Sequence, residues 1–152
     1  MSRTSTLNAP QIWTALARAH RAISIAAERS VTGLGLGLSD FMALEALLHK
    51  GPLTITEIQD KVLLATGSMT AAVDRLERRG LIVRTTTAED RRARVLELTP
   101  EGTRLIEKAY RQHAADLESA MEVLTQTEKR QLFAGLRKLD ESAAAWNKER
   151  KK

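Results

Sequence analysis

The stretch GSMTAAVDRLERRGLIVR, residues 67–84, contains the pattern that decides the fold. On a helical wheel with 3.6 residues per turn, Ala72, Val73 and Leu76 fall within about 60° of Met69. One face of this helix is therefore predicted to pack on a core. The opposite face is small, hydroxylated and charged, and a helix with such side chains can approach another surface closely. It carries Gly67, Thr70, Ala71, Asp74, Arg75 and Arg78.

The next stretch, TTTAEDRRARVLELT at residues 85–99, predicts a β-hairpin with a basic tip. Arg91, Arg92 and Arg94 lie between two apolar and β-branched runs, residues 81–84 and 95–98. A hairpin of this kind, beside a helix that fits the major groove of DNA, can place a guanidinium in the adjacent minor groove and contact phosphates. The charge at the tip therefore favours DNA binding.

Helices are expected on both sides of this region. Asn8 and Pro10 are typical of the start of a helix that continues to about residue 32. A glycine-rich linker, residues 33–39, then leads to a helix over 40–49 capped by Ser39. The remaining helix starts are predicted by the capping boxes TITE (54–57) and TQTE (125–128), by Thr66, and by Thr99 with Pro100.

Composition excludes several classes of function. The chain has 152 residues, 24 basic and 19 acidic side chains, and no cysteine, so disulfides and thiol chemistry are excluded. The histidines His20, His49 and His113 are too widely spaced to suggest a metal site, and no nucleophile or paired-carboxylate motif indicates an enzyme. No cofactor is expected. Without a signal peptide or an apolar run of membrane-spanning length, the sequence predicts a cytoplasmic protein.

A helix, a tight turn, an amphipathic helix and a β-hairpin in this order predict a winged helix-turn-helix, within a mainly α fold that has a small β-wing. The phrases DRLERRGLI and DRRARVLELTPEG resemble the corresponding parts of MarR-family transcriptional regulators, and the element order extends the resemblance over nearly the whole chain. The resemblance implies an N-terminal dimerisation helix (1–34), a DNA-binding region (35–99) and C-terminal dimerisation helices (100–152). Exposed apolar faces on the long terminal helices also favour a homodimer.

The resemblance also implies roles for single residues. It places the recognition helix at Thr66–Arg79, with Arg78 on a phosphate. In the wing, Asp90 would brace the hairpin and Arg92 would enter the minor groove. Arg91 or Arg94 would contact a phosphate. The remaining groove-facing candidates are Ser68, Thr70, Ala71 and Arg75. A carboxylate facing DNA repels it unless it is paired, so we expect Asp74 to bond Arg78 or an arginine of the wing.

MarR-type proteins commonly release DNA when a small aromatic or phenolic molecule binds, so the resemblance implies a repressor with an effector site. The candidate effector contacts are Trp13, Leu16, His20, Phe41, Met42 and Glu45. Trp13 and Phe41 can equally be core residues, and His20 can be an ordinary surface histidine. An alternative function for the whole chain is a winged-helix interaction module whose arginine-rich wing binds an acidic partner protein instead of a pseudo-palindromic operator.

Overall fold

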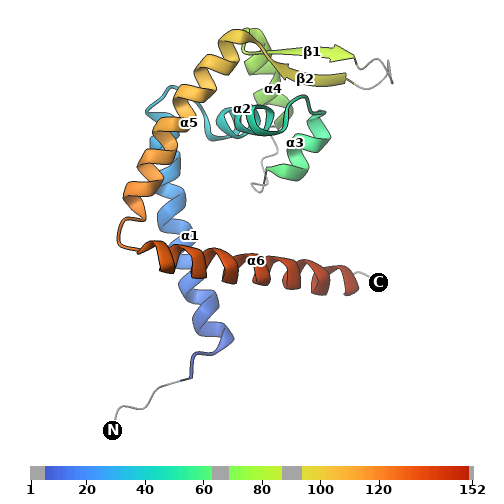
Figure 1. Cartoon of the computed structure of the whole chain (residues 1–152). Coiled ribbons are helices and arrows are strands. Elements are labelled where there is room, and N and C mark those ends of the chain that lie inside the picture. The colour runs from blue at the N-terminus through green and yellow to red at the C-terminus, as the bar shows by residue number, and fades with distance from the viewer. Residues whose placement is uncertain (1–5, 63–68, 87–93, 151–152) are drawn as a thin grey trace. The chain divides into compact units, whose positions relative to one another are not determined.

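The computed structural model describes residues 6–62, 69–86 and 94–150, and it consists of two compact units, Met1–Leu117 and Glu118–Lys152. No helix in these described ranges has both the length and the hydropathy that crossing a membrane requires. The elements in chain order are α1 (Ala9–Thr32), α2 (Leu38–Lys50), α3 (Ile55–Lys61), α4 (Met69–Arg78), β1 (Ile82–Thr86), β2 (Arg94–Leu98), α5 (Pro100–Ala120) and α6 (Gln126–Glu149) (Figure 1).

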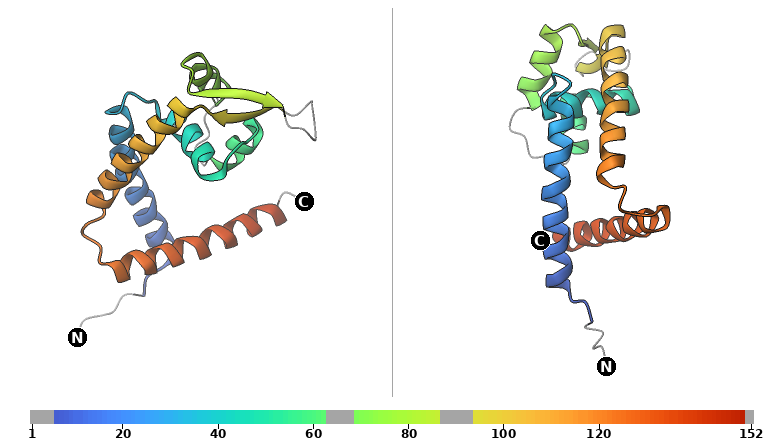
Figure 2. Two further views of the ribbon diagram at one scale, coloured as in Figure 1. Left: turned by 45° about the horizontal axis from the view of Figure 1, so that its top comes forward. Right: turned by 90° about the vertical axis from the view of Figure 1, so that its left-hand side faces the viewer.

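The core of the first unit is formed where α2, α3 and α4 meet the β-ribbon. Helix α2 packs against α4, α3 and β2, and β1 lies beside α4 (Figure 2). Burial of these apolar side chains drives the assembly of the lobe, because each element has a single apolar face that needs cover. The largest fully buried side chains are Phe41, Leu44, Ile58, Met69, Leu76, Ile82, Leu96 and Ile106.

The wing is an antiparallel pair in which Ile82 faces Leu98 and Thr86 faces Arg94. Leu53, between α2 and α3, adds an isolated antiparallel bridge to Leu96, with N···O distances of 3.2 and 2.8 Å. The hairpin predicted over 81–84 and 95–98 is confirmed, although its strands extend to residues 86 and 94. The bridge anchors the wing to the helical part of the lobe.

The base of the wing is closed by a contact between the start of α5 and the end of α4. The Thr99 hydroxyl donates to the Gly80 carbonyl oxygen at 2.7 Å and accepts from the Gly102 amide at 3.0 Å. The Thr99 amide donates to the Leu81 carbonyl oxygen at 3.0 Å. A Cβ atom on Gly102 would lie only 1.9 Å from the Leu81 carbonyl oxygen, so this close approach requires glycine.

Most of the predicted helix starts are confirmed. Asn8 accepts a hydrogen bond from the Gln11 amide, and the Gln11 side chain accepts from the Asn8 amide in return, both at 3.0 Å. Thr54 and Glu57 form the equivalent reciprocal pair at the start of α3. These caps satisfy backbone donors that the first turn of a helix leaves without partners.

The predicted start of α2 is wrong. The helix begins at Leu38, two positions before the expected range of 40–49. Its N-cap is Gly37, which has no side chain to form a cap hydrogen bond. Ser39 lies inside the first turn, and its hydroxyl oxygen lies 3.5 Å from Nη2 of Arg75 on α4. The predicted cap at Thr66 lies outside the described residues.

The second unit contains α6, which begins at the predicted capping box of Thr125 and Glu128. No residue of α6 is buried within the chain, although the helix has a continuous apolar stripe. Apolar stripes of this length on isolated helices mark surfaces for association. The exposed members of the stripe include Leu132, Phe133, Leu136, Leu139 and Trp146.

Candidate nucleic-acid interface

Helix α4 presents the two faces expected from its sequence. Met69, Ala72, Val73 and Leu76 are fully buried in the lobe, which confirms the predicted core face. Because a helix turns 100° per residue, burying this face turns the opposite face to solvent. The exposed residues of that face are Thr70, Ala71, Asp74 and Arg78. The helix can therefore approach another molecule without any rearrangement of the lobe.

Asp74 is paired with an arginine of the wing, as one of the two expected arrangements requires. Its carboxylate binds Nη2 of Arg84 in β1, and Glu77 lies 3.1 Å from Nε of the same guanidinium. The other candidate partner, Arg78, donates instead to the backbone carbonyl oxygen of Asp74 at 3.2 Å. Arg84 therefore offsets two negative charges on the exposed side of α4 and ties that helix to the wing.

Arg75 differs from the other residues on this face because it pairs with a buried side chain. Its Nη2 lies 2.6 Å from Oδ1 of Asp40 in the first turn of α2. Asp40 is only 4% exposed, whereas the side chain of Arg75 is 42% exposed. The hydrogen bond to Asp40, together with its negative charge, raises the pKa of Arg75, so the guanidinium stays protonated.

The wing contributes one described candidate. Arg94 is the first residue of β2, where it faces Thr86 and is exposed. The strand pair thus holds Arg94 at the end of the ribbon that leads to residues 87–93. The other candidate DNA contacts lie outside the described residues, and these are Thr66, Ser68, Asp90, Arg91 and Arg92.

The six candidate effector contacts do not gather at one place. Phe41 is 1% exposed and belongs to the core, with its ring 4.8 Å from that of His113 on α5. Trp13 is 69% exposed, His20 is exposed and Leu16 is half-buried along α1. Of the six, only Met42 and Glu45 line a described hollow.

That hollow, of about 350 Å³, lies between α2 and the end of α3. Its α2 wall is formed by residues spaced three and four apart, which places them on one face of the helix. His49 of this wall also packs edge-on against the Tyr110 ring of α5, with centroids 4.7 Å apart. The lining combines apolar and charged side chains: Met42, Glu45, Ala46, His49, Lys50, Lys61 and Val62.

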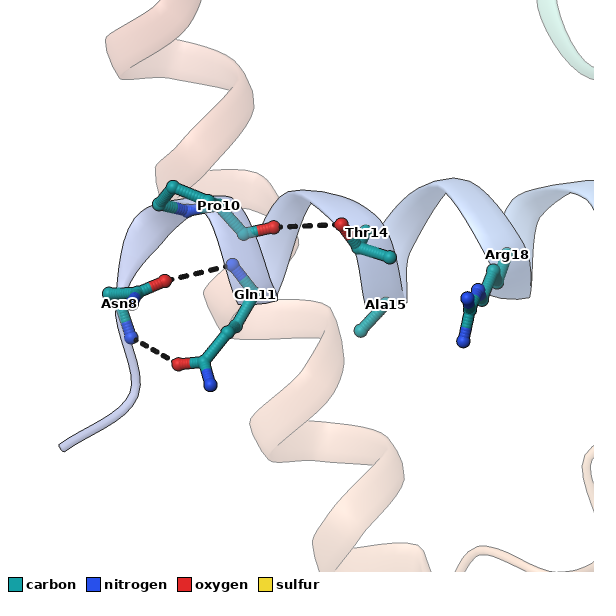
Figure 3. Close-up of a pocket in the computed structure, with 6 residues that line it drawn as sticks. All are labelled: Asn8, Pro10, Gln11, Thr14, Ala15 and Arg18. Carbon is teal, nitrogen blue, oxygen red and sulfur yellow. Dashed lines mark hydrogen bonds between the residues drawn. The ribbon is translucent and has the colours of Figure 1, made fainter. Parts of the chain in front are cut away.

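A second hollow, on the first turns of α1, has a different character (Figure 3). Its polar groups bond one another, with Asn8 and Gln11 paired in the helix cap and the Thr14 hydroxyl donating to the Pro10 carbonyl oxygen at 3.0 Å. The remaining lining residues are Ala15 and Arg18. This hollow is therefore the outer surface of a capped helix end and contains no candidate effector contact.

Three residues that make contacts between elements of the lobe were not singled out from the sequence: Asp40, Arg84 and Gly102. A signal for Asp40 exists, because it shares a helical face with Leu44 and Leu47, and an acid on an apolar face needs a cationic partner. No group of three metal-ligating side chains occurs in the described ranges.

Comparison with known proteins identifies relatives over most of the chain. Residues 34–93 match the model of the MarR family. The transcriptional regulator MhqR of Bacillus subtilis (strain 168) is 35% identical over 118 residues, which are 78% of this chain and 81% of that protein. The transcriptional repressor MdtR of the same organism is 30% identical over 118 residues, 78% of this chain and 76% of that one. The 2,4-dichlorophenol-bound form of the organohalide-sensing regulator RdhR-CbdbA1625 has a similar fold, with a TM-score of 0.72 at 22% identity, covering 93% of this chain and 85% of that chain.

Proposed function

Because the chain belongs to the MarR family of helix-turn-helix transcriptional regulators, which bind DNA and are not enzymes, we propose that it is a repressor that inserts α4 into the major groove of its operator. The observation that carries the proposal is the exposed face of α4, which is small and polar and lies beside a wing joined to it by Arg84. A helix with short side chains fits the major groove, and its neighbouring ribbon can reach the next groove.

Within this arrangement, Thr70 and Ala71 lie against base edges and Arg78 contacts a phosphate. Arg94, exposed at the end of β2, contacts the backbone beside the minor groove. By the family resemblance, Ser68 adds a groove contact and Arg92 enters the minor groove. Phosphate contacts position the protein, whereas base-edge contacts confer sequence specificity.

The DNA-binding arrangement is tested with the DNA that flanks the gene of the protein, in a fluorescence-anisotropy titration at several salt concentrations. Operator DNA should bind about 10³-fold or more tightly than unrelated DNA. Arg92→Ala should weaken operator binding without changing the melting temperature, and Arg78→Ala should lower the salt slope by about one. Weak binding without any sequence preference would instead favour a module that binds an acidic partner protein.

We also propose that the protein acts as a homodimer joined through its terminal helices. The exposed apolar stripe of α6 supports this, because a monomer would leave it in water. Two copies related by a two-fold axis would recognise a pseudo-palindrome with half-sites roughly one helical turn apart. Sedimentation equilibrium of the wild type and of Phe133→Glu tests the interface, and a variant that remains dimeric would contradict it.

The hollow between α2 and α3 is the proposed effector site. Its apolar lining suits an aromatic ring, and the cations Lys50 and Lys61 suit an ionised phenolic oxygen, so the ligand class is a weakly acidic phenol. The 2,4-dichlorophenol found in a regulator of similar fold belongs to that class. Since α2 also packs on α4, a ligand against α2 could alter the position of α4 on DNA.

Release of DNA by 2,4-dichlorophenol, followed by anisotropy, tests the effector proposal. Met42→Trp should fill the hollow and raise the phenol concentration needed for half-release, while DNA affinity without phenol stays close to that of the wild type. Glu107→Gln, at an exposed position of α5, serves as the control. If the phenol releases the Met42→Trp protein as readily as the wild type, the hollow is not the effector site.

A further inference from the structure

We propose that Arg75 serves DNA binding as a positioning residue: by holding the buried Asp40, it fixes the recognition helix α4 on the first turn of α2 and does not itself contact a base. The proposal rests on the role proposed above for α4, and it assigns to Asp40 an effect on DNA affinity although that residue cannot touch DNA. The Asp40–Arg75 pair thus orients α4, whereas Thr70, Ala71 and Arg78 contact the DNA.

The burial of Asp40 is the first observation that supports this. Asp40 is the only buried charged residue among residues 6–62, 69–86 and 94–150. An ionised carboxylate that is removed from water needs a counter-charge and hydrogen-bond donors. The position in the first turn of α2 supplies part of this, because the N-terminus of a helix favours negative charge. Arg75 supplies the counter-charge at 2.6 Å.

The second observation is the location of the two partners on different elements. Phe41, the next residue after Asp40, is buried in the core. The backbone at Asp40 is therefore held in place, and the Asp40 carboxylate has little freedom to move. Arg75 lies next to Leu76, which is equally buried on α4. The hydroxyl of Ser39, the neighbour of Asp40 on α2, lies 3.5 Å from the same Nη2. The ion pair therefore joins two rigid segments at one defined point.

A base contact that used Nη2 of Arg75, or that moved the guanidinium away from α2, would break this pair. The guanidinium would leave Asp40 buried without its cation, which is the arrangement that removing one partner of a buried pair makes unfavourable. Arg78, one turn further along α4, donates through Nε to a backbone carbonyl oxygen at 3.2 Å, and it pairs with no carboxylate among the residues that the structure describes. Arg78 can turn to a phosphate at little cost, and Arg75 cannot.

The experiment is a double-mutant cycle of Asp40→Asn and Arg75→Met, measured as operator affinity and salt slope by fluorescence anisotropy. Methionine keeps the apolar stem of the arginine and removes its charge. Each single variant should weaken operator binding about tenfold, and the double variant should be no weaker than either. The salt slope should stay at its wild-type value, because no phosphate contact is lost.

A direct role for Arg75 predicts different results. Asp40→Asn would then leave affinity unchanged or strengthen it, since it frees the arginine and removes a negative charge. Arg75→Met would lower the salt slope by about one or relax discrimination at one base pair. Either result overturns the proposal. Glu107→Gln, which removes an exposed negative charge from the same unit, controls for net charge and should leave affinity close to that of the wild type.

Two further measurements keep the test decisive. If Asp40→Asn does not fold, Arg75→Lys replaces it: an ammonium can still neutralise Asp40, so affinity and sequence discrimination should recover relative to Arg75→Met, whereas a bidentate base contact would not be restored. Arg78→Ala and Arg92→Ala are measured in parallel. If Arg78→Ala and Arg92→Ala weaken binding and Asp40→Asn does not, only the positioning proposal fails. If neither Arg78→Ala nor Arg92→Ala weakens binding, the proposed placement of α4 and the wing on DNA fails.

Discussion

Gly102→Ala should destabilise the protein although it replaces a glycine in a helix by the best helix former. Gly102 is in the first turn of α5, and a Cβ atom there would lie 1.9 Å from the carbonyl oxygen of Leu81, 2.9 Å from its carbonyl carbon and 3.2 Å from its Cα. All three atoms are backbone, so no side-chain rotation can relieve the overlap. The start of α5 must move away from the residue that links α4 to β1.

The expected magnitude follows from three contributions. Overpacking of this kind costs about 1–3 kcal/mol. The displacement also weakens the hydrogen bond from the Thr99 amide to the Leu81 carbonyl oxygen, now 3.0 Å long, which costs about 1 kcal/mol. Alanine returns about 1 kcal/mol through its higher helix propensity. The net loss in free energy of unfolding is about 1–3 kcal/mol. Each kcal/mol lost should lower the melting temperature by about 2 to 4 °C.

Urea unfolding followed by circular dichroism measures this loss. Gly135→Ala on α6 is the matched control, because a Cβ atom there meets no atom within 4 Å and the same substitution should instead stabilise the helix by about 1 kcal/mol. The two variants share one chemical change, and a Cβ atom meets backbone atoms at Gly102 and open space at Gly135. A Gly102→Ala protein as stable as the wild type would refute the close packing of α5 against the base of the wing.

Two other predictions concern charge. Arg84→Ala should weaken operator binding severalfold, because it leaves Asp74 and Glu77 without their cation on the exposed side of α4. Anisotropy titrations that gave an unchanged affinity would contradict this. The Ser30 hydroxyl lies 2.5 Å from Oδ2 of Asp116, and this hydrogen bond is the main cause that lowers the pKa of the Asp116 carboxyl. The ionised carboxylate therefore stabilises the folded protein at any pH above its ordinary pKa of about 3.9. This stabilisation is lost as the pH falls through the lower pKa of the folded state. Ser30→Ala should therefore be less stable than the wild type at pH 7, and the difference between their urea midpoints should shrink as the pH falls below the ordinary value. A difference that stays constant with pH would exclude this origin.

Sequence pattern predicted most of the helix starts correctly, because a capping box involves only neighbouring residues. The pairs at Asn8 and Gln11 and at Thr54 and Glu57 were predictable because both partners of a capping box lie within three residues of each other. Ser39 has equal capping potential but does not cap, since α2 begins before it and its hydroxyl lies near Arg75. A cap is worth only about 1 kcal/mol, which contacts between elements can outweigh.

The faces of α4 were likewise predictable, whereas the partners of its charged residues were only partly so. Helical periodicity determines the direction in which each Cβ points, and it correctly separated Met69 and Leu76 from Thr70 and Arg78. It cannot determine where a long side chain ends. Arg75 begins on the exposed side and turns back to Asp40, a partner 35 residues away in the chain.

The amino-acid sequence alone was sufficient for the order of helices and strands, their caps and the core face of α4, because these depend on residues a few positions apart and on the periodicity of the backbone. The pairing of Asp40 with Arg75, the pairing of Arg84 with Asp74 and Glu77, and the contact of Gly102 with Leu81 depend on how the elements pack together. The physical reason is that charge pairing and close packing depend on distance in space, and folding brings together residues that sequence separation keeps apart.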